Sequence, residues 1–299
     1  MLFGTKKQQE SIMSEAKNYA DTHGMKLIFG AMVGSVSKGL QYADSDYDTR
    51  FLYLREDFPQ KICVPSQMKE EDLVKRYYTD GEVYEWIPFW EMTSFLQFLN
   101  EPSFKDDFSV GLYNIVGWTF MSPYVWDPYG LQSKLMPLIN SIYNSKYEVA
   151  YHNKILEKYK PEFREETVIT KSYLYAVHAA ATIEWSVMYN VQPPIDLQTL
   201  LLGLNHADIW TEIDKILQEA RIRVRHSFES GITELHDAHF TIVTSKNTII
   251  EKYIEKIMNL EYTDEKVDEK HCKHVISHMY QIIYRTVYES EGLLYGGAR

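Results

Sequence analysis

The chain has 299 residues and a formal net charge of −11, because 42 acidic residues outnumber 31 basic ones. This length exceeds one average domain, so we expect two domains. A chain this acidic repels a phosphate backbone unless its basic residues cluster, which disfavours long nucleic acid as a partner. Two cysteines, no apolar core of a signal peptide and no run of about 18 apolar residues predict a cytoplasmic protein without a membrane segment.

The first part of the chain alternates helical and strand patterns. Residues 8–22 have apolar side chains at helical spacing, and His23-Gly24 ends that pattern. The run MKLIFGAMV at 25–33 has the length and apolarity of a buried strand. We expect one or two helical turns over 35–42 and a second strand over 48–54, which is rich in aromatic and β-branched residues.

The next segment predicts a hairpin and then helices. Residues 74–89, VKRYYTDGEVYEWIPF, hold an Asp80-Gly81 pair between two β-prone stretches. A helix is expected over 89–99, and a loop with a short helix over 100–130.

Beyond about residue 131 the periodicity becomes helical, with a break at Gln192-Pro193-Pro194. Helices are expected over 131–158, 167–190, 196–203, 207–228, 231–259 and 264–291. The sequence therefore predicts an α/β (α+β) fold, with a mixed sheet and flanking helices over 1–125 and an all-helical domain over 126–299.

Two acids, Asp46 and Asp48, lead into the second predicted strand. Alternate residues of a strand share one face, roughly 6.6 Å apart at about 3.3 Å per residue. Carboxylates this close repel each other unless a cation lies between them, and carboxylate oxygens suit Mg²⁺ or Mn²⁺. Two such ions stabilise the attacking and leaving oxygens of a phosphoryl-type transfer.

Gly34-Ser35 precedes these acids and ends the first strand. A glycine there lets the backbone approach a ligand closely, a following helix start offers free N–H groups to an anion, and Ser35 adds a hydroxyl donor. A lone D-x-D is typical of a solvated turn. The combination of buried strand, Gly-Ser, ten residues and S-D-x-D before a strand instead indicates a site for a triphosphate with metal ions.

The segment GSVSKGLQYADSDYDTRFLYL at 34–54 resembles the signature of the DNA polymerase beta-like nucleotidyltransferase superfamily. With Ser45 before the acids and Arg50 after them, it is most similar to the RNA-repair-associated polymerase beta-like proteins of bacteria and phages. A second block, KSYLYAVHAAATIEWSV…PPIDLQTLL at 171–201, resembles the helical motif of the same family. It departs from that motif at His178, where an arginine is expected, and at Glu184, where a basic residue is usual.

The resemblance implies a nucleotidyltransferase fold in which Gly34 and Ser35 contact the triphosphate, Asp46 and Asp48 bind Mg²⁺ or Mn²⁺, and a third acid from a neighbouring strand completes the site. Candidates for the third acid are Glu82 and, as an alternative, Glu85, whereas Asp80 is explained by the turn. A site with only two acids stays open.

Lys171 begins the helix of the second block, together with Tyr173 and Tyr175. If that helix faces the nucleotide, Lys171 can neutralise a triphosphate oxygen and a tyrosine can stack on a base. The alternative is that both tyrosines pack in the helical core. The resemblance favours Lys171 as a nucleotide-binding residue.

Two further patterns have ordinary explanations. The arginines of RIRVRHSF at 221–228 predict a local basic patch, and their spacing to His226 also matches a nuclease-type pattern. His271, His274 and His278 share one helix face near Cys272, which is typical of a polar surface more than of a metal site.

We therefore expect a metal-dependent nucleotidyltransferase that moves a nucleoside monophosphate from an NTP, with ATP as the expected donor, to an acceptor hydroxyl. The acceptor is an RNA end, a protein or a small molecule. A catalytically silent nucleotide-binding scaffold is the alternative of a different class.

Overall fold

A computed structural model of the protein describes residues 6–41, 48–55, 89–99, 107–160, 165–229, 242–262 and 269–290. The chain groups into two compact units, each described here by itself. The sheet unit comprises Met1–Val33, Tyr47–Ile142 and Val267–Arg299, and the helical unit comprises Gly34–Asp46 and Tyr143–Lys266. The predicted boundary after residue 125 concerns independent domains and stays a prediction.

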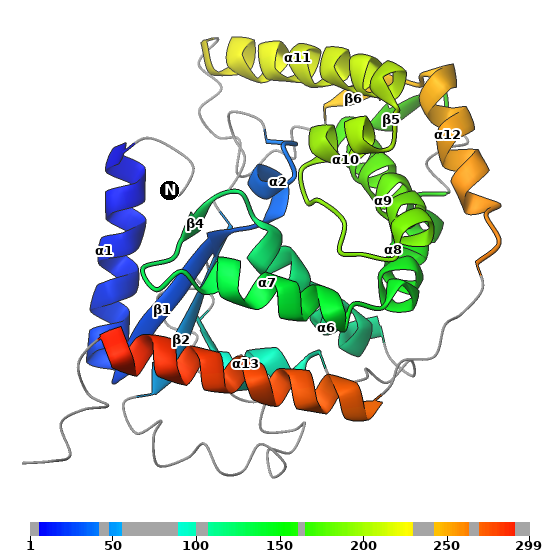
Figure 1. The fold of residues 1–299 in the computed structure, drawn as a ribbon. Coiled ribbons are helices and arrows are strands. Elements are labelled where there is room, and N and C mark those ends of the chain that lie inside the picture. Colours follow the sequence, from blue (N-terminus) through cyan, green and yellow to red (C-terminus); the bar gives the residue numbers. More distant parts are fainter. Residues whose placement is uncertain are drawn as a thin grey trace, which may run out of the picture. The chain divides into compact units, whose positions relative to one another are not determined.

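A mixed sheet of four strands, in the order β3-β2-β1-β4, forms the centre of the sheet unit (Figure 1). Its strands are β1 (Met25–Met32), β2 (Thr49–Arg55), β3 (Phe89–Glu91) and β4 (Val125–Trp126). The pairs β1-β2 and β1-β4 are antiparallel, and β2-β3 is parallel. This arrangement confirms the predicted fold class of a mixed sheet with flanking helices.

Different helices cover the two faces of this sheet. The helices of the sheet unit are α1 (Lys6–Thr22), α5 (Met92–Gln97), α6 (Asp107–Met121), α7 (Leu131–Ser141) and α13 (Glu269–Ser290). On one face Ala16 of α1 packs against Phe51 of β2. On the other face Phe29 of β1 contacts Phe120 of α6, with 4.9 Å between ring centres. Helix α13 runs alongside α7 (Figure 1).

A bulge in β1 lets one strand serve both faces. Leu27 pairs with Tyr53 and Phe29 pairs with Leu52, so Ile28 is an extra residue in the ladder. Paired residues share a face, and neighbouring residues of β2 point to opposite faces. Leu27 therefore faces α1, and Phe29 faces α6.

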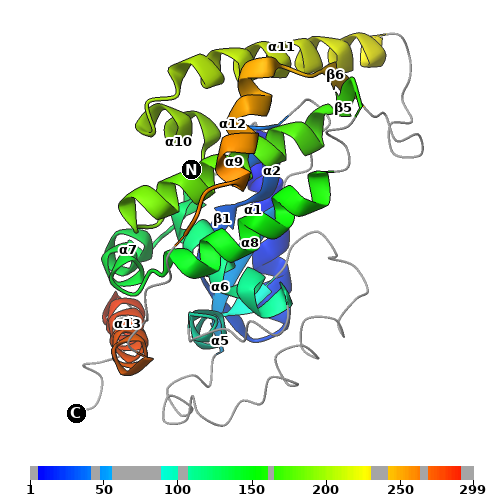
Figure 2. The same cartoon turned by 90° about the vertical axis from the view of Figure 1, so that its right-hand side faces the viewer.

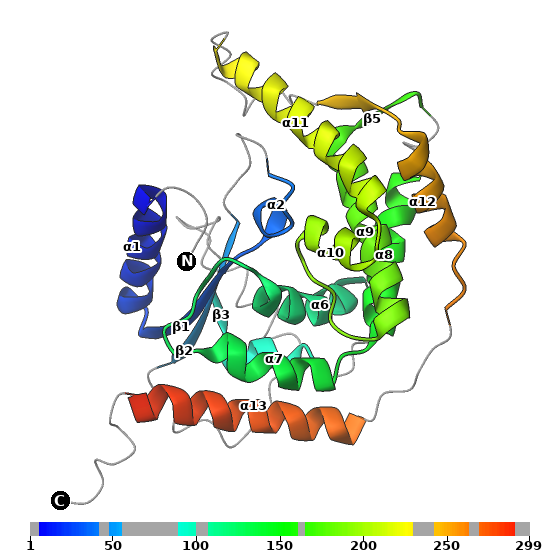
Figure 3. The ribbon, with the colours of Figure 1, turned by 45° about the horizontal axis from the view of Figure 1, so that its top comes forward.

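The helical unit packs its helices around one apolar core. Its elements are α2 (Gly34–Ser37), α8 (Ser145–Tyr159), β5 (Thr167–Ile169), α9 (Thr170–Tyr189), α10 (Leu197–Gly203), α11 (Ala207–Glu229), β6 (Val243–Ser245) and α12 (Thr248–Met258). Helix α9 is the central element, and it packs against α8, α10, α11 and α12 (Figures 2 and 3). The strands β5 and β6 form an antiparallel pair.

Several predicted elements are confirmed with small shifts of their ends: the helix at 8–22, the strands at 25–33 and 48–54, and the helices at 196–203 and 207–228. The helix predicted at 264–291 is confirmed over Glu269–Ser290, the described part of that range. The predicted helix at 35–42 is confirmed only as the short α2.

Five sequence predictions are wrong in part. Residues 89–91 form β3 and not a helix, because they pair in parallel with β2. The short helix expected within the loop at 100–130 is the fifteen-residue helix α6, which is longer than predicted. The expected helix at 131–158 is two helices, and a new helix begins where Asn144 accepts a hydrogen bond from the Lys146 N–H.

The two short strands of the helical unit lie where helix was expected. Residues 167–169 and 243–245 pair with each other as β5 and β6, which the predictions at 167–190 and 231–259 missed.

Most of the predicted hairpin at 74–89 lies outside the described residues. Among the helices that the structure describes, none has both the length and the apolar character needed to cross a membrane. The predicted cytoplasmic location stays a prediction.

Candidate functional site

Antiparallel pairing places the end of β1 beside the start of β2. Met32 pairs with Thr49, and one residue further the Val33 N–H donates a hydrogen bond to the Asp48 carbonyl, with 2.8 Å between the atoms. Gly34 follows Val33 directly in the chain. The residue before the Gly-Ser pair is therefore hydrogen-bonded to the second acid of the S-D-x-D pattern.

The end of β1 is also fixed on its other side. The Met32 N–H donates to the Tyr124 carbonyl at 2.9 Å. The buried hydroxyl of Ser122 donates to the Met32 carbonyl at 2.6 Å. The last residues of β1 thus have little freedom, because the backbone is held from both edges.

Asp48 has an exposed side chain, and a partly buried cation, Arg50, lies two residues further along β2. The Arg50 guanidinium donates a hydrogen bond to the Thr119 hydroxyl and lies 5.8 Å from the centre of the Trp90 ring. Burial lowers the pKa of Arg50 to about 10, while the negative charge of Asp48 acts in the opposite direction. Arg50 therefore remains charged near neutral pH and lies within electrostatic range of the Asp48 carboxylate.

The donor chemistry at Asp48 fits a hard divalent cation, since an exposed carboxylate is the kind of ligand that Mg²⁺ and Mn²⁺ prefer. Asp46, Glu82 and the alternative Glu85 lie outside the described residues. Within the described ranges, no three His, Cys, Asp or Glu side chains gather closely enough to hold a metal ion. The three histidines on α13 are exposed and belong to no such group.

Residues 34–40, named here the motif turn, form a compact turn that begins with α2. Gly34 has a φ of 65° and Gly39 a φ of 72°, both in the left-handed region that favours glycine. The Ser37 hydroxyl donates to the Gly34 carbonyl at 3.0 Å, and the Leu40 N–H donates to the Ser35 carbonyl at 2.9 Å. Ser35 itself is buried, with 7% of its surface exposed.

The second sequence block packs directly on the motif turn. The Leu197 N–H donates to the Lys38 carbonyl at 3.0 Å. The Lys38 ammonium lies 4.5 Å from the centre of the Tyr175 ring, a cation–π contact. Leu40 belongs to the same apolar core as α9 and α10. The motif turn of the first block and the second block are therefore parts of one packed structure in the helical unit.

Lys171 and the two tyrosines after it have different environments on α9. Lys171 is exposed in the first turn of the helix. Tyr173 is fully buried and its hydroxyl donates to the Asn247 carbonyl at 3.3 Å, so it is a core residue. Tyr175 lies one turn after Lys171 and packs its ring between the helical core and Lys38.

Glu184, which stands where the resembled motif usually has a basic residue, accepts hydrogen bonds from three donors in other parts of the helical unit. His206 donates to Oε2 at 2.7 Å, the Tyr253 hydroxyl donates to Oε2 at 2.9 Å, and the Lys256 ammonium donates to Oε1 at 3.1 Å. Burial alone raises the pKa of Glu184, but these hydrogen bonds outweigh it and leave the pKa below its ordinary value. Glu184 is therefore an ionised residue that joins α9 to α12 and to the start of α11.

One arginine of the predicted basic patch contacts the segment that follows the motif turn. The Arg221 Nε–H donates to the Gln41 carbonyl at 3.3 Å, whereas Arg223 donates to the Val243 carbonyl at 2.8 Å. The Arg225 side chain lies outside the described residues, and the nuclease-type pattern stays untested.

Sequence reasoning missed the roles of three residues that surround the predicted motifs: Lys38, Arg50 as a partly buried cation, and His178 as a hydrogen-bond donor. Lys38 had a signal, because it lies inside the Gly-Ser motif between two residues that the turn requires. His178 had none, because its partner is a backbone carbonyl 17 residues away.

Comparisons with known proteins agree with the predicted resemblance. Residues 8–100, about a third of the chain, match the model of the RNA repair pathway DNA polymerase beta family. The chain is also 22% identical over 283 residues to the uncharacterized protein YcgL of Bacillus subtilis (strain 168), a match that covers 94% of this chain and 97% of that protein.

The matched segment contains α1, β1, the Gly-Ser pair, the S-D-x-D acids and β3. The match supports a function of the nucleotidyltransferase type. The predicted family is thus confirmed over residues 8–100, which match the RNA repair pathway DNA polymerase beta family.

Proposed function

We propose that the protein transfers a nucleoside monophosphate from an NTP, with ATP as the expected donor, to an acceptor hydroxyl. The observation that carries the proposal is the hydrogen bond between Val33 and Asp48, directly before the Gly34-Ser35 pair. It holds the backbone of Val33, the residue before the Gly-Ser pair, against the backbone of Asp48, the second acid of the S-D-x-D pattern.

In this proposal Gly34 and Ser35 contact the triphosphate. The positive φ of Gly34 supports this role, because a glycine turn brings backbone N–H groups close to an anion. Ser35 is buried and its carbonyl accepts a hydrogen bond from the Leu40 N–H, so its backbone is held within the motif turn. Lys171, exposed at the start of α9, would neutralise a phosphate oxygen.

Asp46 and Asp48 would hold Mg²⁺ or Mn²⁺, which when bound offsets the negative charge that develops on the phosphate oxygens. The reaction is a displacement at the α-phosphorus. The acceptor oxygen forms a bond to that phosphorus, the bond from it to the oxygen bridging to the β-phosphate breaks, and pyrophosphate leaves. The acceptor proton passes to a carboxylate, Glu82 or the alternative Glu85.

An RNA end is the acceptor that the family description supports. The net charge of −11 works against it unless basic residues gather near the motif, and Lys38 and Arg221 are two such residues. A protein or a small molecule is the second acceptor class, since it does not meet that repulsion. A catalytically silent nucleotide-binding scaffold is the alternative outcome.

The test is transfer of label from each of the four α-labelled NTPs, with Mg²⁺ or Mn²⁺, to RNA oligonucleotides, proteins and small metabolites. Label on RNA ends supports the proposal as stated, and label on a polypeptide or metabolite moves it to the second acceptor class. Asp46→Asn and Asp48→Asn should abolish transfer while the circular dichroism spectrum stays unchanged. NTP binding without transfer to any acceptor would replace the enzyme by the scaffold.

A further inference from the structure

We propose that His178 is a positioning residue for the motif turn: its ring holds residues 191–196, named here the proline loop, and that loop holds Lys38 and Gly39. The inference rests on the proposed function only for the consequence on NTP binding. The mechanical link itself involves residues of the helical unit alone.

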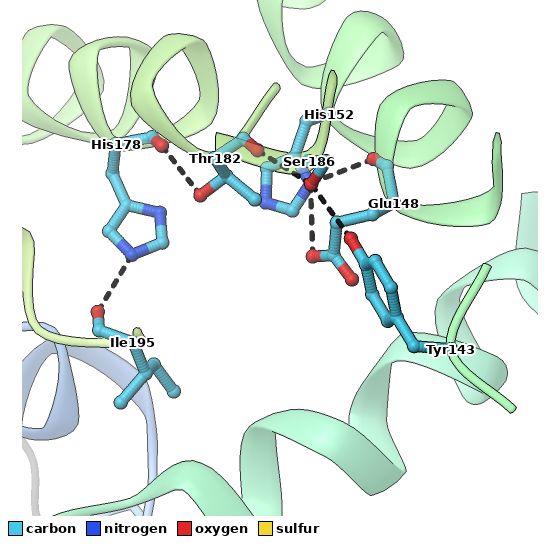
Figure 4. A network of polar contacts seen from close by, with 7 residues as sticks. All are labelled: Tyr143, Glu148, His152, His178, Thr182, Ser186 and Ile195. Atoms are coloured by element: carbon cyan, nitrogen blue, oxygen red, sulfur yellow. Dashed lines mark hydrogen bonds and ion pairs between the residues drawn. The ribbon is translucent and has the colours of Figure 1, made fainter. Parts of the chain in front are cut away.

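His178 donates one hydrogen bond into the proline loop. Its Nε2 lies 2.8 Å from the Ile195 carbonyl oxygen, and because a carbonyl only accepts, Nε2 carries the proton (Figure 4). The ring is 96% buried, since 4% of its surface is exposed. A buried carbonyl that loses its donor is costly, so this contact fixes the loop at Ile195.

The backbone carbonyl of His178 belongs to a series of hydrogen bonds along one face of α9. The Thr182 hydroxyl donates to the His178 carbonyl at 2.8 Å, and the Ser186 hydroxyl donates to the Thr182 carbonyl at 2.7 Å (Figure 4). The Tyr143 hydroxyl donates to Ser186 Oγ at 2.8 Å. His178, Thr182 and Ser186 lie four residues apart along α9 and form one polar stripe on its buried side.

The neutral form of His178 suits this role. Burial lowers its pKa well below the ordinary value, and the positive charge of Lys38 and the nearby His152 act in the same direction. Lys38 thus lies close enough to influence the ring electrostatically, which places the motif turn and His178 in one environment. Of these influences, only the hydrogen bond to the Ile195 carbonyl favours the charged form, and its effect on the pKa of His178 is smaller than the effect of burial.

Leu197, the first residue of α10 and the one directly after the proline loop, contacts the motif turn. The Leu197 N–H donates to the Lys38 carbonyl at 3.0 Å. At Gly39, an added Cβ would lie 2.7 Å from Asp196 Oδ2, so only glycine leaves room for that carboxylate. The other oxygen of Asp196 caps α10 by accepting from the Thr199 N–H at 2.8 Å. Asp196 and Leu197 therefore pack directly against Lys38 and Gly39 of the motif turn.

The order of contacts gives the expected consequence. Loss of the His178 donor frees the Ile195 carbonyl, then loosens the Leu197 N–H, and finally lets Lys38 and Gly39 move. The residues that would contact the triphosphate, Gly34 and Ser35, belong to the same turn and are closed by the Leu40 bond to Ser35. His178 touches no reacting atom in this scheme and acts through the backbone.

The test compares His178→Leu, which removes the donor, with His178→Gln, whose amide N–H₂ reaches a similar distance, and with Thr182→Val as a matched control on the same helix face. Hydrogen exchange measured by mass spectrometry, without nucleotide, follows the peptides covering 36–41 and 194–200. Titration calorimetry with a non-hydrolysable ATP analogue and Mg²⁺ follows binding.

His178→Leu should speed exchange in both peptides and weaken binding of the analogue about tenfold, the effect of one lost hydrogen bond in a buried site. His178→Gln should restore both, and Thr182→Val should lower stability without changing either. If His178→Leu does not fold, His178→Asn, whose amide is too short to reach Ile195, takes its place.

Unchanged exchange at 36–41 in a folded donor-less variant would overturn the inference, as would equal effects of His178→Leu and Thr182→Val. If the wild-type protein binds no NTP analogue, the proposed function fails, while the exchange data still decide whether His178 positions the turn.

Discussion

Two of the buried polar side chains of helix α9, those of His178 and Glu184, lie six residues apart, and their hydrogen bonds differ in kind. Glu184 is ionised and accepts from His206, Tyr253 and Lys256. His178 is neutral and donates one bond to a backbone carbonyl. Both stand where the family motif leads one to expect a basic residue.

One helix can therefore serve stability and site geometry through separate residues. A charged group with three donors binds helices to one another, and its loss leaves uncompensated polar groups. A neutral ring with one backbone partner contributes less to stability but sets where a loop lies. Substitutions at the two positions should therefore separate folding from nucleotide binding.

The largest expected effect on stability comes from Glu184→Gln. It removes the negative charge beside Lys256 and one strong acceptor from His206 and Tyr253, so the free energy of unfolding should fall by about 3 kcal/mol. Urea unfolding followed by circular dichroism measures it. The folded fraction should bind the ATP analogue as the wild type does, and a loss of binding at full folding would contradict the separation.

Gly39→Ala should have the next largest effect. The φ of 72° at this position costs a residue with a side chain about 1–2 kcal/mol, and the added Cβ meets Asp196. Gly130→Ala is the matched control, because Gly130 has a φ of 65° but its added Cβ would meet atoms no closer than 3.9 Å.

Both glycine variants should lose stability in thermal unfolding, with the larger loss for Gly39→Ala. Only Gly39→Ala should weaken binding of the ATP analogue. Equal losses of binding in the two variants would show that the contact between Asp196 and the motif turn does not contribute to binding of the ATP analogue.

The pH dependence of stability should reveal the buried histidines. Burial lowers the pKa of His152 to about 3, only partly opposed by its hydrogen bond to the Glu148 carbonyl, and Lys38 lowers it further. The pKa of His178 is also far below its ordinary value of 6.5. Below that pH the unfolded chain binds protons that the folded chain does not, so stability should fall as the pH decreases.

The slope between pH 6.5 and about 5 should reach up to about 1.4 kcal/mol per pH unit for each of these histidines. Glu184, with its pKa below 4.5, adds a loss only at more acid pH. His178→Gln should remove one histidine's share of the slope in urea titrations across this range. A stability that is constant from pH 7 to 5 would mean that the histidines are not buried as neutral groups.

Lys171→Ala should have the smallest effect on stability, within about 0.5 kcal/mol, because the side chain is exposed. The affinity of the Lys171→Ala variant for the ATP analogue should nevertheless fall severalfold if the Lys171 ammonium contacts a phosphate. Lys252→Ala, another lysine of the helical unit, is a control for a general charge effect. Equal affinities of the two variants would remove Lys171 from the site.

The sequence predicted those parts of the fold that local patterns determine. Strands β1 and β2 are continuous apolar runs, and α11 has a regular apolar stripe, so each of these elements could be predicted from its local sequence. β3 was not visible, because Phe89–Glu91 is a strand only through its parallel pairing with β2. The break between α7 and α8 did have a local signal, the N-cap residue Asn144, which periodicity alone overlooked.

The candidate site divides in the same way. Gly34, Ser35, Asp46 and Asp48 were found from spacing along the chain, whereas the support of the motif turn depends on contacts between distant segments. Leu197 lies far along the chain from Lys38, and no pattern in either segment indicates their hydrogen bond. Only the folded chain brings the two family blocks together.

The most direct test of the central claim compares ATP labelled at the α-phosphate with ATP labelled at the γ-phosphate, in the presence of Mg²⁺ and an acceptor identified by the transfer screen. The account predicts that only the α-label moves to the acceptor, that one pyrophosphate is released per transfer, and that Asp48→Asn stops both. Transfer of the γ-label, or release of inorganic phosphate without transfer, would contradict it.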